Sequence, residues 1–321
     1  MESRGSWTDL IAGVGLKISE VFDLGQEEYM PGIGNLLTAS TGEGAQRNFT
    51  GKTGLGRLVK FDDGDNISSN RRYKTYTTKV VYNNYGRYVE VTKNAIDDRD
   101  FSGELDEMKD LSIAANFSQD ESGMQLFNGA FATTSVVNGY IMNFYGDGKP
   151  TYSTVHPTVV PGGSTQSNAS STGVAFSHNN IETAKVALIE QKTDDAIPLA
   201  LMGKPMIVVP PALEREAREE TESALDPATA NNAINVWRGT MDMASSTFLG
   251  AANSGSDTAW FVIVPGRDKQ YHEVRQAARL ESEVDVKSKA VTFTVDARWA
   301  DYVKDWRRKW ASKGDLAAYS S

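Results

Sequence analysis

The sequence predicts a protein of the α+β class, with two small subdomains and an extended segment that the chain cannot cover by itself. Three observations support this. Residues 71–91 are rich in Tyr, Thr and Val, as strands are. Residues 103–131 have the pattern of one long helix, and residues 178–265 alternate helices with buried strands. A chain of 321 residues is long enough to bury a full hydrophobic core.

The composition is that of a soluble globular protein that is not specialised for binding nucleic acid. Hydrophobic residues make up 40% of the chain, and no apolar run is long enough to span a membrane. The first residues include Glu2 and Asp9 and lack the apolar region of a signal peptide. The formal net charge is −9, whereas proteins that bind DNA phosphates are usually basic. An acidic container for nucleic acid is compatible with this charge.

Residues 6–22 are expected to form a short amphipathic helix. Ser6 and Asp9 approximate a capping box, and apolar residues recur after them at helical spacing. Gly13 and Gly15 weaken the helix, so it needs a partner surface. The glycine-rich stretch that follows has no period and is expected to be an extended arm.

A two-stranded ribbon is expected next. The segment "RLVKF", residues 57–61, is predicted to be a strand that leads through the turn "DDGDN" to the strands of residues 71–91. Neither face of residues 71–82 is cleanly apolar, and a lone ribbon is marginally stable in water. We therefore expect a neighbouring subunit to cover it. The candidate inter-subunit contacts are Trp7, Leu10, Phe22, Arg72, Tyr73, Lys74, Tyr76 and Tyr82.

The long helix is preceded by a short helical turn that Thr92 can cap. Residues 103–131 carry Glu104, Asp106 and Glu107 near their start, which suits the positive end of a helix dipole. At about 1.5 Å per residue the helix spans on the order of 40 Å, the length of a whole subunit.

The second half of the chain begins with a long Gly/Ser/Thr/Pro-rich connection, residues 146–177, which either is functional or separates subdomains. The α/β subdomain at 178–265 follows, with a helix capped by Asn179 and Glu182. Residues 270–310 return to strand character. In this segment Val291, Phe293 and Val295 alternate with polar residues. This alternation predicts a strand with one buried and one solvent-exposed face.

No motif supports an enzyme. A phosphate-binding loop needs a glycine five residues before the Gly-Lys pair, but before the Gly-Lys-Thr triplet at 51–53 that position holds Gln46. No helix is expected after the triplet either. The segment "HEVRQ" has Gln276 where a zinc site needs a second histidine. In the turn "DDGDN" the glycine comes too early for a calcium-binding loop, and the distant bidentate Glu of such a loop is missing. Cysteine is absent, and the three histidines, His156, His178 and His272, are expected in loops or at element ends, with His272 at the surface.

We therefore expect no catalytic, cofactor-binding or metal-binding residues. A nucleotide-dependent enzyme built on Lys52 is the alternative from another class. The segment "KDWRRKW", residues 304–310, admits two interpretations. In the favoured one, Trp306 and Trp310 anchor this segment while its charges point to solvent. In the other, Arg307 and Arg308 contact packaged DNA, because basic residues interleaved with aromatic ones bind single strands.

The order of these segments resembles the major capsid proteins of tailed bacteriophages, and among them the Mu-like major head subunits. The residues that carry the resemblance are "YGRYVEVTKNAIDDRDF", "GDGKPTYSTVHPTVVPGG", "PMIVVPPALEREA" and "VDARWADYVKDWRRKW". The resemblance implies an N-terminal arm at 1–48, an extended β-hairpin loop at 49–91 and a peripheral domain with a long spine helix at 92–177. It further implies an axial domain at 178–265 and C-terminal strands completing the peripheral domain at 266–321.

The resemblance also implies the function: a structural subunit that self-assembles as hexamers and pentamers into an icosahedral head enclosing double-stranded DNA. Portal, scaffolding and decoration proteins are the other expected partners, with no sequence-specific DNA binding and no membrane. Assembly is expected in the bacterial host cytoplasm, and the final location is the virion. Some members cross-link a loop lysine to a neighbour, for which Lys52, Lys60, Lys74 and Lys79 are candidates by residue type alone. The alternative is an encapsulin-like compartment of the same fold.

Overall fold

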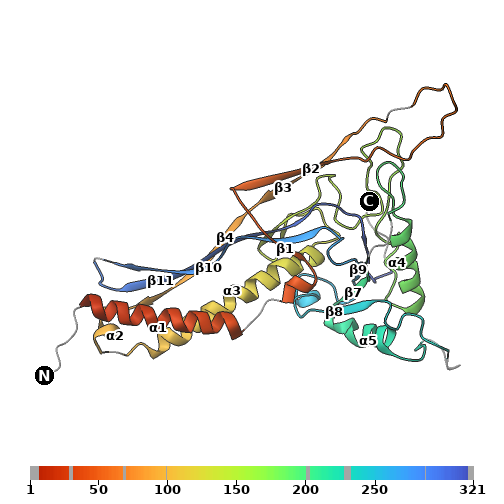
Figure 1. The fold of residues 1–321 in the computed structure, drawn as a ribbon. Helices are drawn as coiled ribbons and strands as arrows, with labels where there is room; N and C mark the ends of the chain where they lie inside the picture. Colours follow the sequence, from red (N-terminus) through yellow and green to blue (C-terminus); the bar gives the residue numbers. More distant parts are fainter. Residues whose placement is uncertain are drawn as a thin grey trace.

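The computed structural model describes residues 7–28, 32–67, 70–98, 100–199, 203–227, 233–285 and 287–316, with the side chains of residues 7–11 outside this description. Two sheets lie along an elongated molecule, and a hairpin projects from it at one corner (Figure 1). None of the described helices combines the length and the apolar character that a bilayer span requires.

Two long helices, α1 (Trp7–Glu28) and α3 (Ser102–Asn128), pack along one another beside the larger sheet (Figure 1). The long helix predicted at 103–131 is confirmed. Helix α1 runs beyond residue 22, where we expected an extended arm. It continues because it docks on α3: Ser112 Oγ donates to the carbonyl of Phe22 at 2.5 Å, and a Cβ on Gly25 would lie 2.8 Å from Ser112 Cβ. The short helix α2 (Lys93–Asp98) follows Thr92, whose Oγ1 accepts from the Ala95 amide at 3.3 Å, as predicted.

The larger sheet, which we call the peripheral sheet, has the order β1-β10-β11-β6-β5, with β4 also paired to β11. The long antiparallel pair β10 and β11 forms its centre, and the alternation predicted at Val291, Phe293 and Val295 is confirmed because all three are buried against α1 and α3. Its strands are β1 (Thr38–Thr41), β4 (Asn83–Val91), β5 (Val136–Val137), β6 (Tyr140–Asn143), β10 (Gln270–Val284) and β11 (Val291–Val303).

The smaller sheet, the axial sheet, has the order β12-β9-β7-β8. Its last strand comes from the segment that we expected to complete the peripheral domain. The reason is packing: Trp310 lies 4.9 Å from Trp260 in the core of the axial sheet. Its elements are β7 (Met206–Val209), β8 (Asp242–Ser245), β9 (Trp260–Ile263), β12 (Lys309–Ser312), α4 (His178–Glu190) and α5 (Glu214–Glu222), with short 3-10 turns at Gly32–Asn35, Pro211–Leu213 and Ala251–Asn253.

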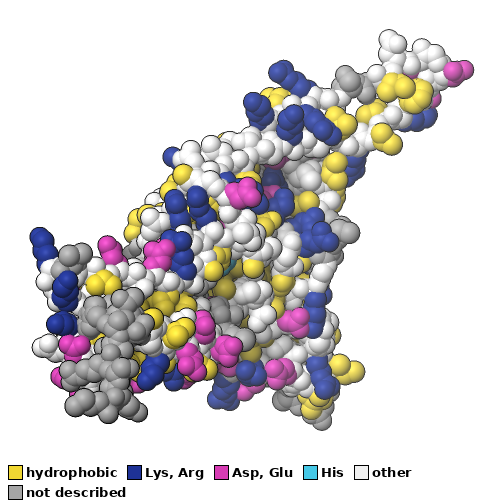
Figure 2. Space-filling view, turned by 60° about the vertical axis from the view of Figure 1, so that its left-hand side comes forward, with side chains coloured by type: hydrophobic (Ala, Val, Ile, Leu, Met, Phe, Trp, Pro, Cys, Tyr) yellow, Lys and Arg dark blue, Asp and Glu magenta, His cyan; other side chains and the backbone are white. Residues whose placement is uncertain are grey.

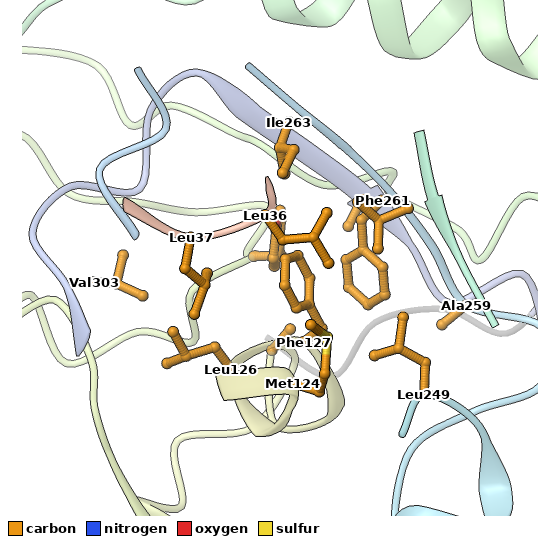
Figure 3. Packing of buried hydrophobic residues seen from close by; sticks show 14 of the residues in the cluster. Leu36, Leu37, Met124, Leu126, Phe127, Leu249, Ala259, Phe261, Ile263 and Val303 are labelled. Carbon is orange, nitrogen blue, oxygen red and sulfur yellow. The ribbon is translucent and has the colours of Figure 1, made fainter. Parts of the chain in front are cut away.

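The core between the two sheets is built around the C-terminal end of α3 (Figure 3). Phe127 packs edge-on against Phe261 of β9, with ring centroids 5.2 Å apart, while Leu37 and Val303 approach from the peripheral side. Because this one cluster touches both sheets, the spine helix joins the two subdomains into a continuous body.

The projecting hairpin consists of β2 (Gln46–Lys52) and β3 (Lys74–Val81), paired antiparallel. The strand predicted at 57–61 is wrong, because that segment has no strand partner and lies in the irregular loop between β2 and β3. The polar segment "QRNFTGK" pairs with β3 instead. Cross-strand contacts between side chains, such as Thr50 Oγ1 with Thr77 Oγ1 at 2.5 Å, stabilise this pairing.

Candidate functional site

The loop that joins β2 to β3, residues 53–73 and here called the tip, exposes large hydrophobic side chains. Leu58 is completely exposed, at 103%, and Ile67 is 76% exposed. Leu55, Val59 and Phe61 are also more than half exposed. Figure 2 shows hydrophobic side chains gathered on the projecting end of the molecule. An exposed apolar group of this kind marks a surface for association.

A single buried carboxylate fixes the other end of the hairpin. The Glu273 side chain on β10 is only 1% exposed, and it accepts hydrogen bonds from Tyr82, Tyr302 and Arg47. Burial raises the pKa of Glu273, but the hydrogen bonds from Tyr302, Tyr82 and Arg47 outweigh it and lower the pKa below its ordinary value. The carboxylate therefore stays charged and ties β2 and the β3–β4 junction to the peripheral sheet.

Beside this anchor, between the hairpin and the loop that follows α4, lies a cleft of about 560 Å³, here called the basal cleft. Its walls carry six Lys or Arg side chains against three Asp, an excess of three positive charges in a chain whose net charge is −9. Aromatic rings supply much of the remaining wall. The charged residues are Lys52, Arg267, Lys269, Lys304, Arg307 and Arg308 against Asp194, Asp195 and Asp305, and the rings are Phe49, Tyr76, Tyr145 and Tyr271.

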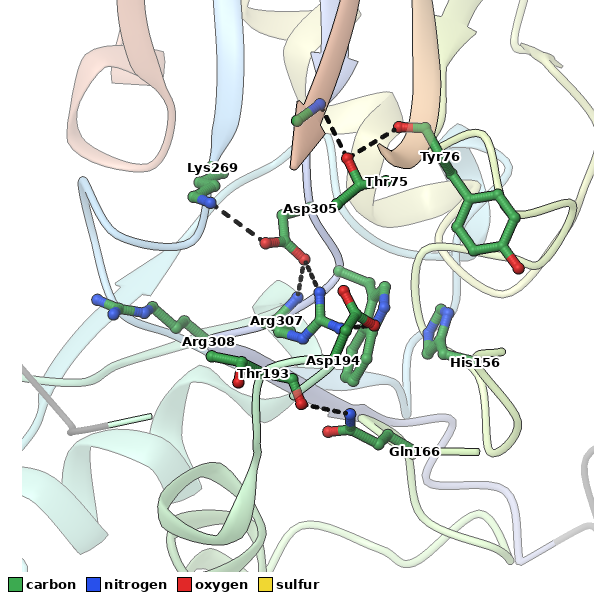
Figure 4. A network of polar contacts seen from close by, with 12 residues as sticks. Thr75, Tyr76, His156, Gln166, Thr193, Asp194, Lys269, Asp305, Arg307 and Arg308 are labelled. Atoms are coloured by element: carbon green, nitrogen blue, oxygen red, sulfur yellow. Dashed lines mark hydrogen bonds and ion pairs between the residues drawn. The ribbon is translucent and has the colours of Figure 1, made fainter. Parts of the chain in front are cut away.

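An ion-pair network forms the floor of this cleft (Figure 4). The buried Arg307 guanidinium lies 2.8 Å from Asp194 and 3.1 Å from Asp305, and Lys269 reaches Asp305 at 3.2 Å. Burial lowers the pKa of Arg307, yet Asp305 and Asp194 raise it above its ordinary value overall. Arg307 is thus a structural residue. The interpretation in which it contacts DNA is wrong, because its guanidinium is already buried and neutralised.

Lys304 is held in the cleft by aromatic rings. Its ammonium lies 3.9 Å from the ring centroid of Phe49 and 4.0 Å from that of Tyr271. Burial lowers the pKa of Lys304. Arg308, beside it, is half-buried and adopts a left-handed backbone with φ 64°, an uncommon conformation for a residue other than glycine. No ion pair involving Lys52, Lys304, Arg267 or Arg308 occurs among the described residues.

The tail segment that supplies these residues was partly predicted. Trp306 and Trp310 are buried, which confirms that they anchor it. The expectation that its charges point to solvent is wrong for Arg307 and for Lys309, which is fully buried.

The sequence-predicted contact residues fall into three groups. Arg72 and Lys74 are exposed, and Tyr73 and Tyr76 are half-buried at the junction of β3 with the tip. Phe22 and Tyr82 are buried inside the chain, so the inter-subunit surface that we propose below excludes them. Trp7 and Leu10 lie on the first turn of α1, but their side chains are outside the described residues.

The Gly-Lys-Thr triplet is not a phosphate-binding loop. It ends β2 and leads into the irregular tip, where Thr53 Oγ1 accepts from the Tyr73 amide at 3.1 Å. No helix N-terminus follows it, so the backbone amides that cradle phosphates in such loops are not available. Within the described ranges, no three His, Asp or Glu side chains converge as metal ligands do.

The prediction that His272 lies at the surface is wrong, because its side chain is buried. His156 is fully buried, stacked on Trp306 at 4.3 Å and 2.7 Å from Asp147. His272 lies 2.7 Å from Asp301, and His178 lies 2.7 Å from Glu220. A carboxylate satisfies one ring nitrogen of each imidazole, which allows His156 and His272 to be buried and His178 to be partly buried. The partners of His178 and His272 are 42 and 29 positions away in the sequence, so no local pattern predicts them.

Comparison with known proteins gives one family and a consistent fold. A family model described as phage capsid protein matches residues 75–310. The capsid of a native GTA particle is similar to this chain at 11% sequence identity, covering 88% of this chain and 90% of that one with a TM-score of 0.55. The capsid of the Myoviridae phage XM1 matches at 12% identity with the same coverage and a TM-score of 0.52.

A further solved structure, the capsid of Ralstonia phage GP4, matches at 13% identity, covers 87% of each chain and has a TM-score of 0.51. No curated protein matches the sequence. At these identities the structural likeness establishes the fold, and the resemblance stated from the sequence is confirmed.

Proposed function

We propose how this chain, which belongs to the phage capsid protein family, builds a shell. It is a structural major capsid protein. The finer statement is our proposal: copies associate as hexamers and pentamers into an icosahedral head that encloses double-stranded DNA. Contacts of roughly 2,000–5,000 Å² per subunit pair are expected for an obligate assembly of this kind.

The observation that carries this proposal is the contrast between the two ends of the hairpin. Its base is fixed by the buried Glu273, whereas its tip exposes Leu58, Phe61 and Ile67 to water. Leaving such side chains exposed is unfavourable by about 25 cal/mol for each Å² of apolar surface. An apolar tip on a hairpin fixed at its base therefore supports a role in covering a second copy, together with the exposed Arg72 and Lys74 and the half-buried Tyr73 and Tyr76.

The remaining partners follow from the same role. We propose that the head also contains portal, scaffolding and decoration proteins, that it assembles in the bacterial host cytoplasm, and that the chain ends up in the virion. The net charge of −9 supports a container that does not adhere to the DNA it holds.

Negative-stain microscopy and sedimentation of the purified protein test this function, with a scaffolding protein added if required. We expect closed shells from the natural chain. The double variant Leu58→Ser/Phe61→Ser should remain folded but form few shells. The control Val136→Ser, at a residue about as exposed as Phe61 (52% against 55%), should assemble normally. Stable monomers of the natural chain under all assembly conditions would contradict the proposal.

A further inference from the structure

We propose that the basal cleft receives the acidic turn of the hairpin tip of a second copy of this chain. This inference rests on the proposed function, since it names the surface on the neighbour where the tip docks. It makes the contact between two copies a head-to-tail one, from the far end of one hairpin to the cleft between the next hairpin and its body.

The cleft has the chemistry of an acceptor for carboxylates. Lys304 is held by aromatic rings at a fixed position, and Arg267 lies exposed at the cleft wall. Arg308 is also half-exposed, and its backbone amide donates to Gln191 Oε1 at 2.6 Å, which fixes its main chain. Arg307 and Lys269 are already paired with aspartates, so the unpaired cations remain to bind an anionic group.

The tip presents the matching group at its far end. Asp62, Asp63 and Asp65 are all exposed on one tight turn, and Asp62 makes an exposed ion pair with Lys60 at 3.2 Å. The Asp65 amide donates to the carbonyl of Asp62 at 3.0 Å, and the Asp62 amide donates to the Asp65 carboxylate at 3.3 Å. Phe61 precedes this turn and is 55% exposed, so one insertion would place carboxylates on cations and an apolar ring among Phe49, Tyr76 and Tyr271.

The occupant must come from another copy. The hairpin strands pair outward as far as Lys52 with Lys74, and the tip continues away from the body (Figure 1). The acidic turn therefore points away from its own cleft, which lies along hairpin residues 48–54. A contact between two different surfaces of the same chain is heterologous, and it closes into a ring when the rotation between copies closes.

Cross-linking tests the contact directly, because the chain has no cysteine of its own. The single variants Asp63→Cys and Arg267→Cys are each purified, mixed and assembled under mild oxidation. We expect a covalent dimer only from the mixture. The control mixture of Asp63→Cys with Arg87→Cys, an exposed arginine on β4 that does not line the cleft, should give none. Shells that form without a dimer above this control would overturn the inference and leave the proposed function standing.

Charge reversal provides a second test. The tip variant Asp62→Lys/Asp63→Lys and the cleft variant Arg267→Glu/Arg308→Glu should each reduce shell yield at least tenfold. The protein that carries all four changes should recover it, because the charges match again. The natural contact should also weaken as salt is raised. If the cleft variant assembles normally but loses only retained DNA or bound inorganic phosphate, the cleft serves a polyanion and the inference fails. If the natural chain forms no shell, the proposed function itself fails.

Discussion

The buried charges of Lys309 and Asp268 give the sharpest prediction about stability. Both side chains are fully buried, and each charge acts on the pKa of the other, although no direct ion-pair contact joins them among the described residues. Burial lowers the pKa of Lys309 and raises the pKa of Asp268, while each charge opposes the shift of the other. Replacing Lys309 by Met therefore leaves a carboxylate buried without its cation.

The expected loss in the free energy of unfolding is about 3–5 kcal/mol at pH 7, the usual cost of breaking a buried pair by removing one partner. The loss should depend on pH. The pKa of Asp268 is already raised to about 6 in the natural chain, where the charge of Lys309 lowers it, so in Lys309→Met it should rise further. Folded Lys309→Met therefore keeps on Asp268 a proton that the unfolded chain releases near pH 4. The folded state then binds more protons, so stability falls as pH rises, by about 1.4 kcal/mol per pH unit above pH 4 until the folded carboxyl also ionises.

Urea unfolding of the unassembled subunit at pH 5, 6 and 7 measures this. Lys309→Met should be closest to the natural chain at pH 5, and adding Asp268→Asn should remove the pH dependence and restore part of the stability. The exposed Lys287→Met is the control and should change stability by less than about 0.5 kcal/mol. A loss below about 1 kcal/mol at pH 7, with no slope across this range, would refute the reasoning.

Three further substitutions probe other features of the fold. Gly146→Ala should destabilise the subunit by at least about 1–3 kcal/mol in urea unfolding. Its Cβ would lie 2.0 Å from the Thr77 carbonyl oxygen of β3, whereas Gly103→Ala meets no atom within 4 Å and should be neutral or stabilising. Glu273→Gln should cost about 1.5–3 kcal/mol at pH 7. Because the pKa of Glu273 is lowered in the fold, its contribution is present above the unfolded pKa, 4.5, and is lost as pH falls through the folded pKa. Acid titration of unfolding should therefore show a loss in the natural chain that the Gln variant lacks. Arg307→Met should destabilise the subunit by about 3–5 kcal/mol, because Asp194 would be left buried without its cation. A variant that kept full stability in thermal melts and lost only DNA would contradict that assignment.

Local patterns predicted the elements whose burial is regular along the chain. The alternation of Val291, Phe293 and Val295 follows from periodicity, because one side of the strand faces a continuous core. The 27-residue helix α3 was predicted from its acidic first turn instead, since its buried side includes polar residues such as Asn116 and Asp120. The position of β2 could not be found in this way. Its segment is polar and includes Gly51, and its strand identity comes from pairing with β3 more than twenty residues later.

The site itself was predicted only in outline. The need for a covering neighbour followed from the ribbon's lack of an apolar face. The contact with Glu273 that fixes the base of the hairpin could not be predicted. Arg47 and Glu273 are 226 positions apart in the sequence, and only the fold brings them together. The same holds for Arg307 with Asp194, 113 positions apart, whose pairing turned an apparent surface arginine into a buried one. A single sequence gives the charge and the spacing of its residues. Whether a charged side chain is buried depends on a partner that a distant part of the chain contributes.

The return of the chain to the axial sheet has a consequence for synthesis. Strand β9 pairs on one side with β7 and on the other with Lys309–Ser312, which a ribosome produces some fifty residues later. Until then Trp260 lacks its Trp310 neighbour and one edge of β9 stays open. A polypeptide interrupted before that point would lack a finished subdomain to offer to a growing lattice, which gives the fold an inherent check against incorporating incomplete copies.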